Sequence, residues 1–99
     1  MKRWVAIVGF AMSFWHPHAA QHHSVALSWN GPTVWHGAPV VYTVYRNYGK
    51  CTGPWVTVGT ATGALTLTDN SPTLVSGRKH CYYVADSGGK SNIATVVIP

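Results

Sequence analysis

The sequence predicts an all-β protein built as a two-sheet antiparallel sandwich, and three observations carry this prediction. Apolar and polar residues alternate with a period of two in several short stretches after residue 20, as in strands with one buried face. No stretch in that region repeats apolar residues at spacings of three and four, the pattern of an amphipathic helix. Clusters of Gly, Pro, Asn and Ser separate the short stretches, as in β-sandwiches and barrels.

The first twenty residues have the pattern of a secretory signal peptide. Met1-Lys2-Arg3 is a cationic start, residues 4–15 are uncharged and mostly apolar, and Ala19-Ala20 supplies small residues before a cleavage point. The apolar run is shorter than the about twenty residues of a membrane-spanning helix. We therefore expect a signal peptide at 1–20, a domain at 21–99, and a secreted, periplasmic or cell-surface location. An uncleaved anchor, which would be the protein's only contact with a membrane, and an ordered N-terminal segment are the alternatives.

Six strands are expected in the remaining chain, each bounded by residues that favour turns. In order, they are 24–29, which ends at Asn30-Gly31-Pro32; 40–46, which follows His36-Gly37-Ala38-Pro39; 55–60, which follows Gly53-Pro54; 64–69, which ends at Asn70-Ser71-Pro72; 79–85, which lies between Ser76-Gly77 and Ser87-Gly88-Gly89; and 92–98.

Alternation assigns one buried face to each strand. The burial of these side chains, at about 25 cal/mol per Å² of apolar surface, is the main stabilising contribution in a domain of this size. The expected core consists of Val25, Leu27, Trp29, Tyr42, Val44, Leu67, Tyr82, Val84 and Val96.

Charge and cysteine content restrict the class of partner and the compartment. Residues 21–99 carry five Lys or Arg against two Asp, a net charge of +3, which is too mild for a nucleic-acid-binding surface. Cys51 and Cys81 are the two cysteines, and in an exported protein a disulfide is the first interpretation. Closing a loop of that length contributes about 3 to 4 kcal/mol. Free thiols and a metal or redox role are the alternatives.

These residues together resemble fibronectin type III domains, an immunoglobulin-like family, and above all the modules of secreted bacterial proteins. The resemblance covers nearly all of residues 23–99. The matching segments are 23–29 (HSVALSW) with strand B, 41–46 (VYTVYR) with strand C, Gly53-Pro54-Trp55 with the entry to C′, 66–69 (TLTD) with strand E, 81–84 (CYYV) with strand F, and 91–99 with strand G.

The chain departs from the family at three places. His80 stands where the family has the tyrosine whose hydroxyl closes the E–F corner, so this hydrogen bond is replaced or absent. Strand A is expected to be short or missing, with residues 10–20 as one possible source of it. The F–G connection, 86–90, is short.

The resemblance implies a spatial grouping of charges and cysteines. Strands C and F are antiparallel neighbours in the family, so the end of C lies beside the start of F and a Cys51–Cys81 bridge is geometrically plausible. The same arrangement gathers Arg46, Lys50, Arg78 and Lys79 at one end of the domain. Such an end suits an acidic partner, with affinity that falls as salt rises. A solvated end that only keeps the domain soluble is the alternative.

Aromatic residues supply a second candidate surface. Trp35 and His36 fall in the B–C loop at the opposite end, where an exposed tryptophan stacks on sugars or anchors protein contacts. Tyr45, Tyr48 and Tyr83 are expected on the outer face of the C, F, G sheet, where aromatic side chains also do no more than pack on their neighbours.

Metal and catalytic functions have little support. His22 and His23 form a remote candidate copper site near the start of the domain. No nucleophile motif accompanies the carboxylates Asp69 and Asp86. We therefore expect a module without enzymatic activity or cofactor that binds a protein or polysaccharide at the cell surface. A structural subunit that assembles by β-strand augmentation is the alternative, and the oligomeric state is left open.

Overall fold

The computed structural model describes residues 7–14, 22–72 and 74–99, and it is all β. The strands are β1 Ile7–Phe14, β2 His22–Trp29, β3 Val34–Trp35, β4 Ala38–Pro39, β5 Val41–Tyr48, β6 Val56–Thr62, β7 Thr66–Asp69, β8 Lys79–Asp86, β9 Gly89–Lys90 and β10 Ala94–Val97.

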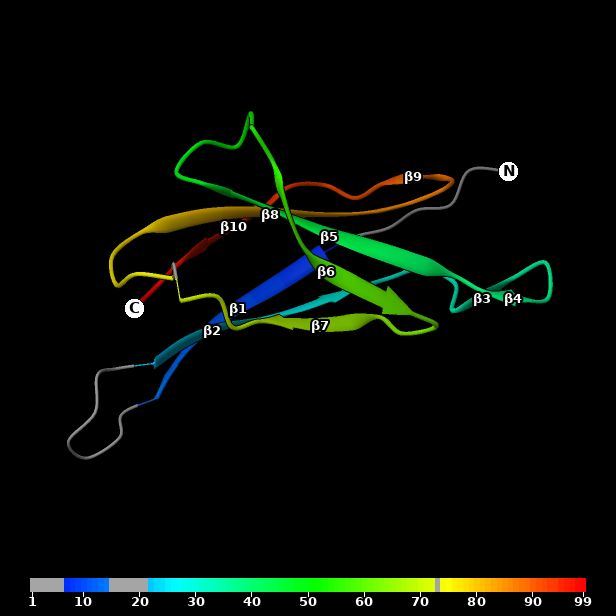
Figure 1. Cartoon of the computed structure of the whole chain (residues 1–99), viewed down its shortest axis with the longest axis horizontal. Coiled ribbons are helices and arrows are strands. Elements are labelled where there is room, and N and C mark those ends of the chain that lie inside the picture. The colour runs from blue at the N-terminus through cyan, green and yellow to red at the C-terminus, as the bar shows by residue number, and fades with distance from the viewer. Residues whose placement is uncertain (1–6, 15–21, 73) are drawn as a thin grey trace.

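The main strands form two antiparallel sheets (Figure 1). One sheet has the order β1-β2-β7, and the other has the order β10-β8-β5-β6, with β9 paired to β8. Their facing side chains form a single core. The predicted all-β sandwich is confirmed, and each of the six predicted strands is present with boundaries shifted by a few residues at most.

The first sheet contains a long strand where the sequence predicts a short or missing strand A. β1 pairs with β2 over eight residues, from Ile7 opposite Trp29 to Phe14 opposite His22. With segment 1–20 present, strand A is therefore neither short nor missing, and the alternative in which this segment supplies it applies, with residues 7–14 instead of 10–20. The cleavage of that segment stays a prediction, and residues 15–20 lie outside the described part.

The core contains the residues that alternation selects. Eight of the nine predicted core side chains are buried, and Leu67 is partly buried against them. Trp29 of β2 meets Tyr42 of β5 edge to face, with 5.5 Å between ring centroids. This contact joins the two sheets, since each ring comes from a different layer. The other buried members of the core are Val25, Leu27, Val44, Tyr82, Val84 and Val96, joined by Val40, Ala61, Leu74 and Ile98.

The loops divide between the two ends of the sandwich (Figure 1). The connection between β7 and β8, drawn in yellow, lies at the end opposite to the β3–β4 hairpin. That hairpin turns through His36 and Gly37, whose φ angles are both positive at 51° and 78°, as a two-residue hairpin turn requires. In the described ranges, no helix has the length and apolar character needed to cross a membrane.

Candidate binding site at the basic end

The end of β5 and the start of β8 bring two loops together. Tyr48 lies opposite His80 in the β5–β8 register, and the backbone N–H of Gly49 donates to the carbonyl of Lys79 over 3.0 Å. Residues 49–55 and the β7–β8 connection therefore meet at one end of the sandwich.

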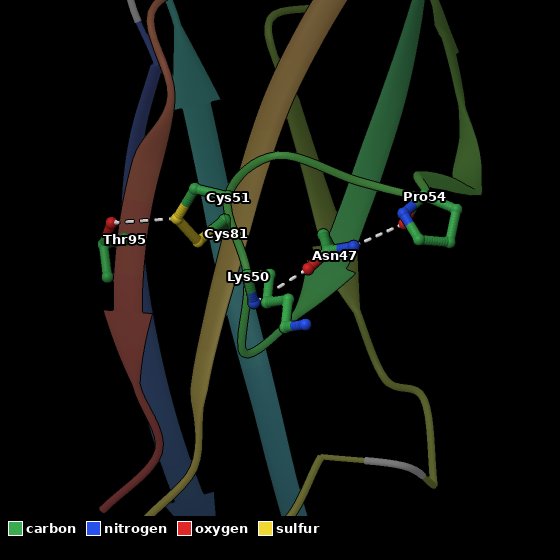
Figure 2. Close-up of a disulfide and its surroundings, with 6 residues drawn as sticks. All are labelled: Asn47, Lys50, Cys51, Pro54, Cys81 and Thr95. Carbon is green, nitrogen blue, oxygen red and sulfur yellow. Dashed lines mark hydrogen bonds between the residues drawn. A yellow bond between two sulfur atoms is a disulfide. The ribbon is translucent and has the colours of Figure 1, made fainter.

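A disulfide holds the 49–55 loop over the outer face of this sheet (Figure 2). Cys51 is bonded to Cys81 of β8, with 5.4 Å between their Cα atoms, so the predicted bridge is confirmed. Buried Asn47 makes two hydrogen bonds to the loop: its side-chain N–H donates to the carbonyl of Pro54, and its side-chain oxygen accepts from the backbone N–H of Lys50. The loop thus has a defined position on the sheet.

A buried ionic network lies between the two sheets just inside this end. The guanidinium of Arg46 donates to Asp69 Oδ2 over 2.6 Å, and the Tyr82 hydroxyl donates to the same oxygen over 2.8 Å. Asp69 Oδ1 accepts from the backbone N–H of Ser71 over 3.0 Å. Burial, together with the nearby Asp69 carboxylate, raises the pKa of Tyr82 far above its usual range, so this phenol stays a donor.

His80 is fully buried beside this network, in edge contact with Tyr48 at 5.0 Å. Neither of its ring nitrogens has a hydrogen-bond partner within the described structure. The corner bond expected of the family is therefore absent at His80, and backbone bonds such as Arg78 N–H to Val75 O hold the turn. Desolvation lowers the pKa of His80, with Arg46 and Arg78 contributing in the same direction and Asp69 opposing them.

The predicted cluster of cations is present, but its members differ in kind. Arg46 is largely buried and its charge is paired with Asp69. Lys50, Arg78 and Lys79 are exposed and have no carboxylate partner in the described part of the chain. We call these three residues the basic end. Asp86, the other carboxylate, lies at the far end of β8.

A cavity of about 650 Å³ opens at the basic end. Three of the side chains around it are large, apolar and well exposed, namely Tyr48 at 45%, Val56 at 51% and Val75 at 47%. The Arg78 guanidinium carbon lies 5.2 Å from the centre of the Tyr48 ring, so a basic group stands at the rim. The cavity is lined by Arg46, Asn47, Tyr48, Pro54, Val56 and Val75. It therefore combines apolar walls with a cationic rim, a combination that suits a ligand with both apolar and acidic groups.

Trp35 at the opposite end is less available than the sequence suggests. Its ring is half-buried against the core rather than exposed, and it meets His36 edge to face at 4.9 Å. It borders a smaller cavity of about 360 Å³ together with Ser87 of the β8–β9 turn. The binding role predicted for Trp35 and His36 stays a prediction.

The outer aromatic face consists of rings that contact one another. Tyr45 and Tyr83 stack at 4.7 Å, Trp55 meets Tyr83 edge to face at 4.7 Å, and the Lys90 ammonium lies 5.7 Å from the Tyr83 ring. Tyr48, which the sequence places on this face, instead contacts buried His80. The alternation of β5 explains this, because Tyr48 shares the phase of Tyr42 and Val44.

The candidate copper site at His22 and His23 stays untested. His22 and His23 begin β2, opposite Phe14 and Ser13, and the side chain of His22 lies outside the described ones. No group of three or more His, Cys, Asp or Glu able to hold a metal occurs among the described residues.

Sequence alternation alone already carried a signal for the Arg46–Asp69 pair. Asp69 is in phase with the apolar residues of 65–67, and Arg46 is in phase with Tyr42 and Val44. Two opposite charges at core-facing positions indicate a buried pair, because a buried charge requires a partner.

Comparison of the chain with family models, with curated proteins and with solved structures finds no match.

Proposed function

We propose that the chain is a non-catalytic binding module of the fibronectin type III kind, which contacts an anionic protein or polysaccharide outside the cytoplasm through its basic end. One observation carries the proposal: Lys50, Arg78 and Lys79 are exposed without a carboxylate partner among the described residues, and the Arg78 guanidinium lies over Tyr48 at the rim of an apolar cavity. Neither acidic side chain is paired with these three cations: Asp69 is buried and bonded to Arg46 and Tyr82, and Asp86 lies at the far end of β8.

Two further features support the module and its location. The strand orders β1-β2-β7 and β10-β8-β5-β6 place the segment that resembles C beside those that resemble F and C′, as the family has them. The Cys51–Cys81 bridge favours an oxidising compartment, because structural disulfides persist in exported proteins.

The expected binding is electrostatic and salt-dependent. The three exposed cations of the basic end raise the local concentration of an anionic partner. This attraction weakens as salt is added, because the Debye length falls from about 10 Å at 0.1 M salt to about 3 Å at 1 M. The apolar walls of the cavity add a component that salt does not remove.

The proposal is tested by titrating the protein with polyglutamate and with alginate at low and high salt. A variant carrying Lys50→Gln, Arg78→Gln and Lys79→Gln should lose binding to any polymer that the wild-type protein binds, whereas Lys90→Gln, which removes a cation elsewhere, should retain it. Equal binding by wild type and the triple variant, or no binding of either polymer, would contradict the proposal.

A second candidate is a structural subunit that assembles by strand augmentation, and the β1–β2 pairing favours it. β1 lies within the segment predicted to be cleaved, so its removal would leave eight positions of β2 without a strand partner on that side. Such an edge accepts a strand from another chain. Mass spectrometry of the exported protein identifies its N-terminus. Analytical ultracentrifugation of the cleaved protein should then show that its average mass increases with protein concentration. A cleaved protein that stays monomeric would rule this candidate out.

A further inference from the structure

β6 presents a free edge next to the cavity. It is the last strand of its sheet, and its seven residues, VTVGTAT, include no charge and no proline. Edge strands are usually protected by charged residues, proline, bulges or short length. β6 has only a bulge at Val58, where the register shifts between Val44 and Tyr45. Among the other edge strands, β7 and β10 have four residues each and end at Asp69 or shortly before Pro99. β1 is also long and uncharged, but it belongs to the other sheet.

The cavity begins where this edge begins. The last β5–β6 pair joins Arg46 to Val56, and β5 continues through Tyr48 with no further β6 partner. Val56 is both the first residue of β6 and part of the cavity wall. A strand that pairs antiparallel with β6 would therefore have its C-terminal residues beside the cavity.

We propose that the β6 edge and the cavity together bind one extended acidic peptide segment of a partner protein. The segment adds to β6 as an antiparallel strand, inserts one large apolar side chain into the cavity, and places an acidic residue opposite Arg78. The inference rests on the proposed function and narrows its partner from anions in general to a polypeptide.

The edge itself favours a polypeptide over a polysaccharide. Alternate N–H and C=O groups of an edge strand point away from the sheet and are matched by another backbone, while a neighbouring pocket selects a side chain. Antiparallel addition is the commoner geometry in sheets. It brings the C-terminal part of the segment to Val56, beside the apolar rim and the Tyr48–Arg78 contact.

Composition excludes a second copy of this chain as the acidic strand. The whole sequence has only two acidic residues. Asp69 is 2% exposed and bonded to Arg46 and Tyr82, and Asp86 accepts a hydrogen bond from Gly88 N–H in the β8–β9 turn. The acidic segment must come from a different protein.

The test uses the full-length oxidised protein and the probe peptide TVTVTVFEDE, compared with the same peptide N-methylated at alternate backbone nitrogens. N-methylation keeps every side chain and charge but prevents strand pairing. We expect the unmodified peptide to shift the amide resonances of Val56–Thr62 and the methylated peptide to bind at least about tenfold more weakly. Equal binding of the two peptides, shifts confined to other strands, or no binding at millimolar peptide would overturn the inference.

Matched variants test the cavity. Val75→Glu introduces a carboxylate into the cavity and should weaken peptide binding about tenfold. The new charge would be buried against the apolar side chain of the peptide and would repel the peptide's acidic residues. Val34→Glu is the control, because Val34 is similarly exposed, at 57% against 47%, on β3 at the opposite end. If both variants bind equally, the cavity is not the anchor and the inference fails.

Failure of this inference is distinguishable from failure of the proposed function. Suppose that the triple Lys50, Arg78, Lys79 variant loses binding to polyglutamate and alginate, while peptide binding is unaffected by Val75→Glu and by N-methylation. This result would reject the strand-addition site alone. Unchanged binding of all ligands by the charge variant would reject both.

Discussion

The buried carboxylate Asp69 should be a major determinant of stability, and Asp69→Asn tests this. The substitution keeps the shape but removes the charge that Arg46 Nη1 meets at 2.6 Å. The side chains of Arg46 and Asp69 are 14% and 3% exposed, so the arginine would be left largely buried without a counter-charge. Breaking a buried pair costs about 3 to 5 kcal/mol. Because Arg46 keeps some solvent contact, we expect a loss of about 2 to 3 kcal/mol.

Urea denaturation of the oxidised protein at pH 7 measures this loss. With a slope of about 1 kcal/mol per M for a small domain, the midpoint should fall by about 2 to 3 M. Asp86→Asn is the matched control: Asp86 is less buried than Asp69, and its Oδ1 accepts from the exposed Gly88 N–H, so its replacement should cost less than Asp69→Asn. Equal losses for the two variants would refute the reasoning.

Replacement of the network by apolar side chains distinguishes the net contribution of the ion pair to the free energy of unfolding from the cost of leaving one partner buried alone. The combined variant Arg46→Met, Asp69→Leu and Tyr82→Phe leaves neither an orphan charge nor an orphan hydroxyl, and its one further loss is the hydrogen bond from Ser71 N–H to Asp69 Oδ1. Apolar replacement of a complete buried ionic group is often close to neutral. We therefore expect the combined variant to be more stable than Asp69→Asn alone, and a lower stability would show that the network has a net stabilising effect.

Three further perturbations test other parts of the fold. Cys51→Ser with Cys81→Ser should cost about 3 to 4 kcal/mol through the loop entropy of thirty residues, as measured by urea denaturation; a loss below about 1 kcal/mol would contradict this. Because the pKa of His80 is lowered from 6.5, the folded protein keeps this ring neutral while the unfolded chain protonates it, so stability should be full above pH 6.5 and decline as pH falls below it. Denaturation curves of His80→Leu should lack this decline, and an unchanged profile would exclude His80 as its source. A Cβ on Gly31 would collide with the hydroxyl of Tyr42, which donates to Pro32 O; Gly31→Ala should therefore lower the melting temperature, and unchanged melting would show that the ring shifts freely.

Some parts of the fold were predictable because they depend on local patterns. Alternation correctly identified the buried apolar positions of β2 and β5, including Leu27 and Val44, but not the buried polar residues Ser24 and Asn47. It did not predict β3 and β4, because strands of two residues are too short to show an alternation. It also could not predict β1, because an apolar run after a cationic start has the same composition in a signal peptide and in an edge strand.

The candidate site was only partly predictable. The resemblance to a known family placed Lys50, Arg78 and Lys79 at one end, and the structure has them there. The cavity depends on where β6 starts relative to β5 and on the position of Val75 in a loop. Such a relation between distant segments leaves no trace in local spacing.

The all-β class and most of the core follow from the sequence, because strand period is a local property, and two cysteines in an exported chain favour a disulfide without excluding free thiols or a metal or redox role. The tertiary structure adds that Arg46 is neutralised by Asp69, that Lys50, Arg78 and Lys79 have no carboxylate partner among the described residues, and that an uncharged strand edge ends at an apolar cavity. These facts concern atoms brought together from separate strands and loops. The folding of the two sheets against each other brings them together, and no single segment encodes that contact.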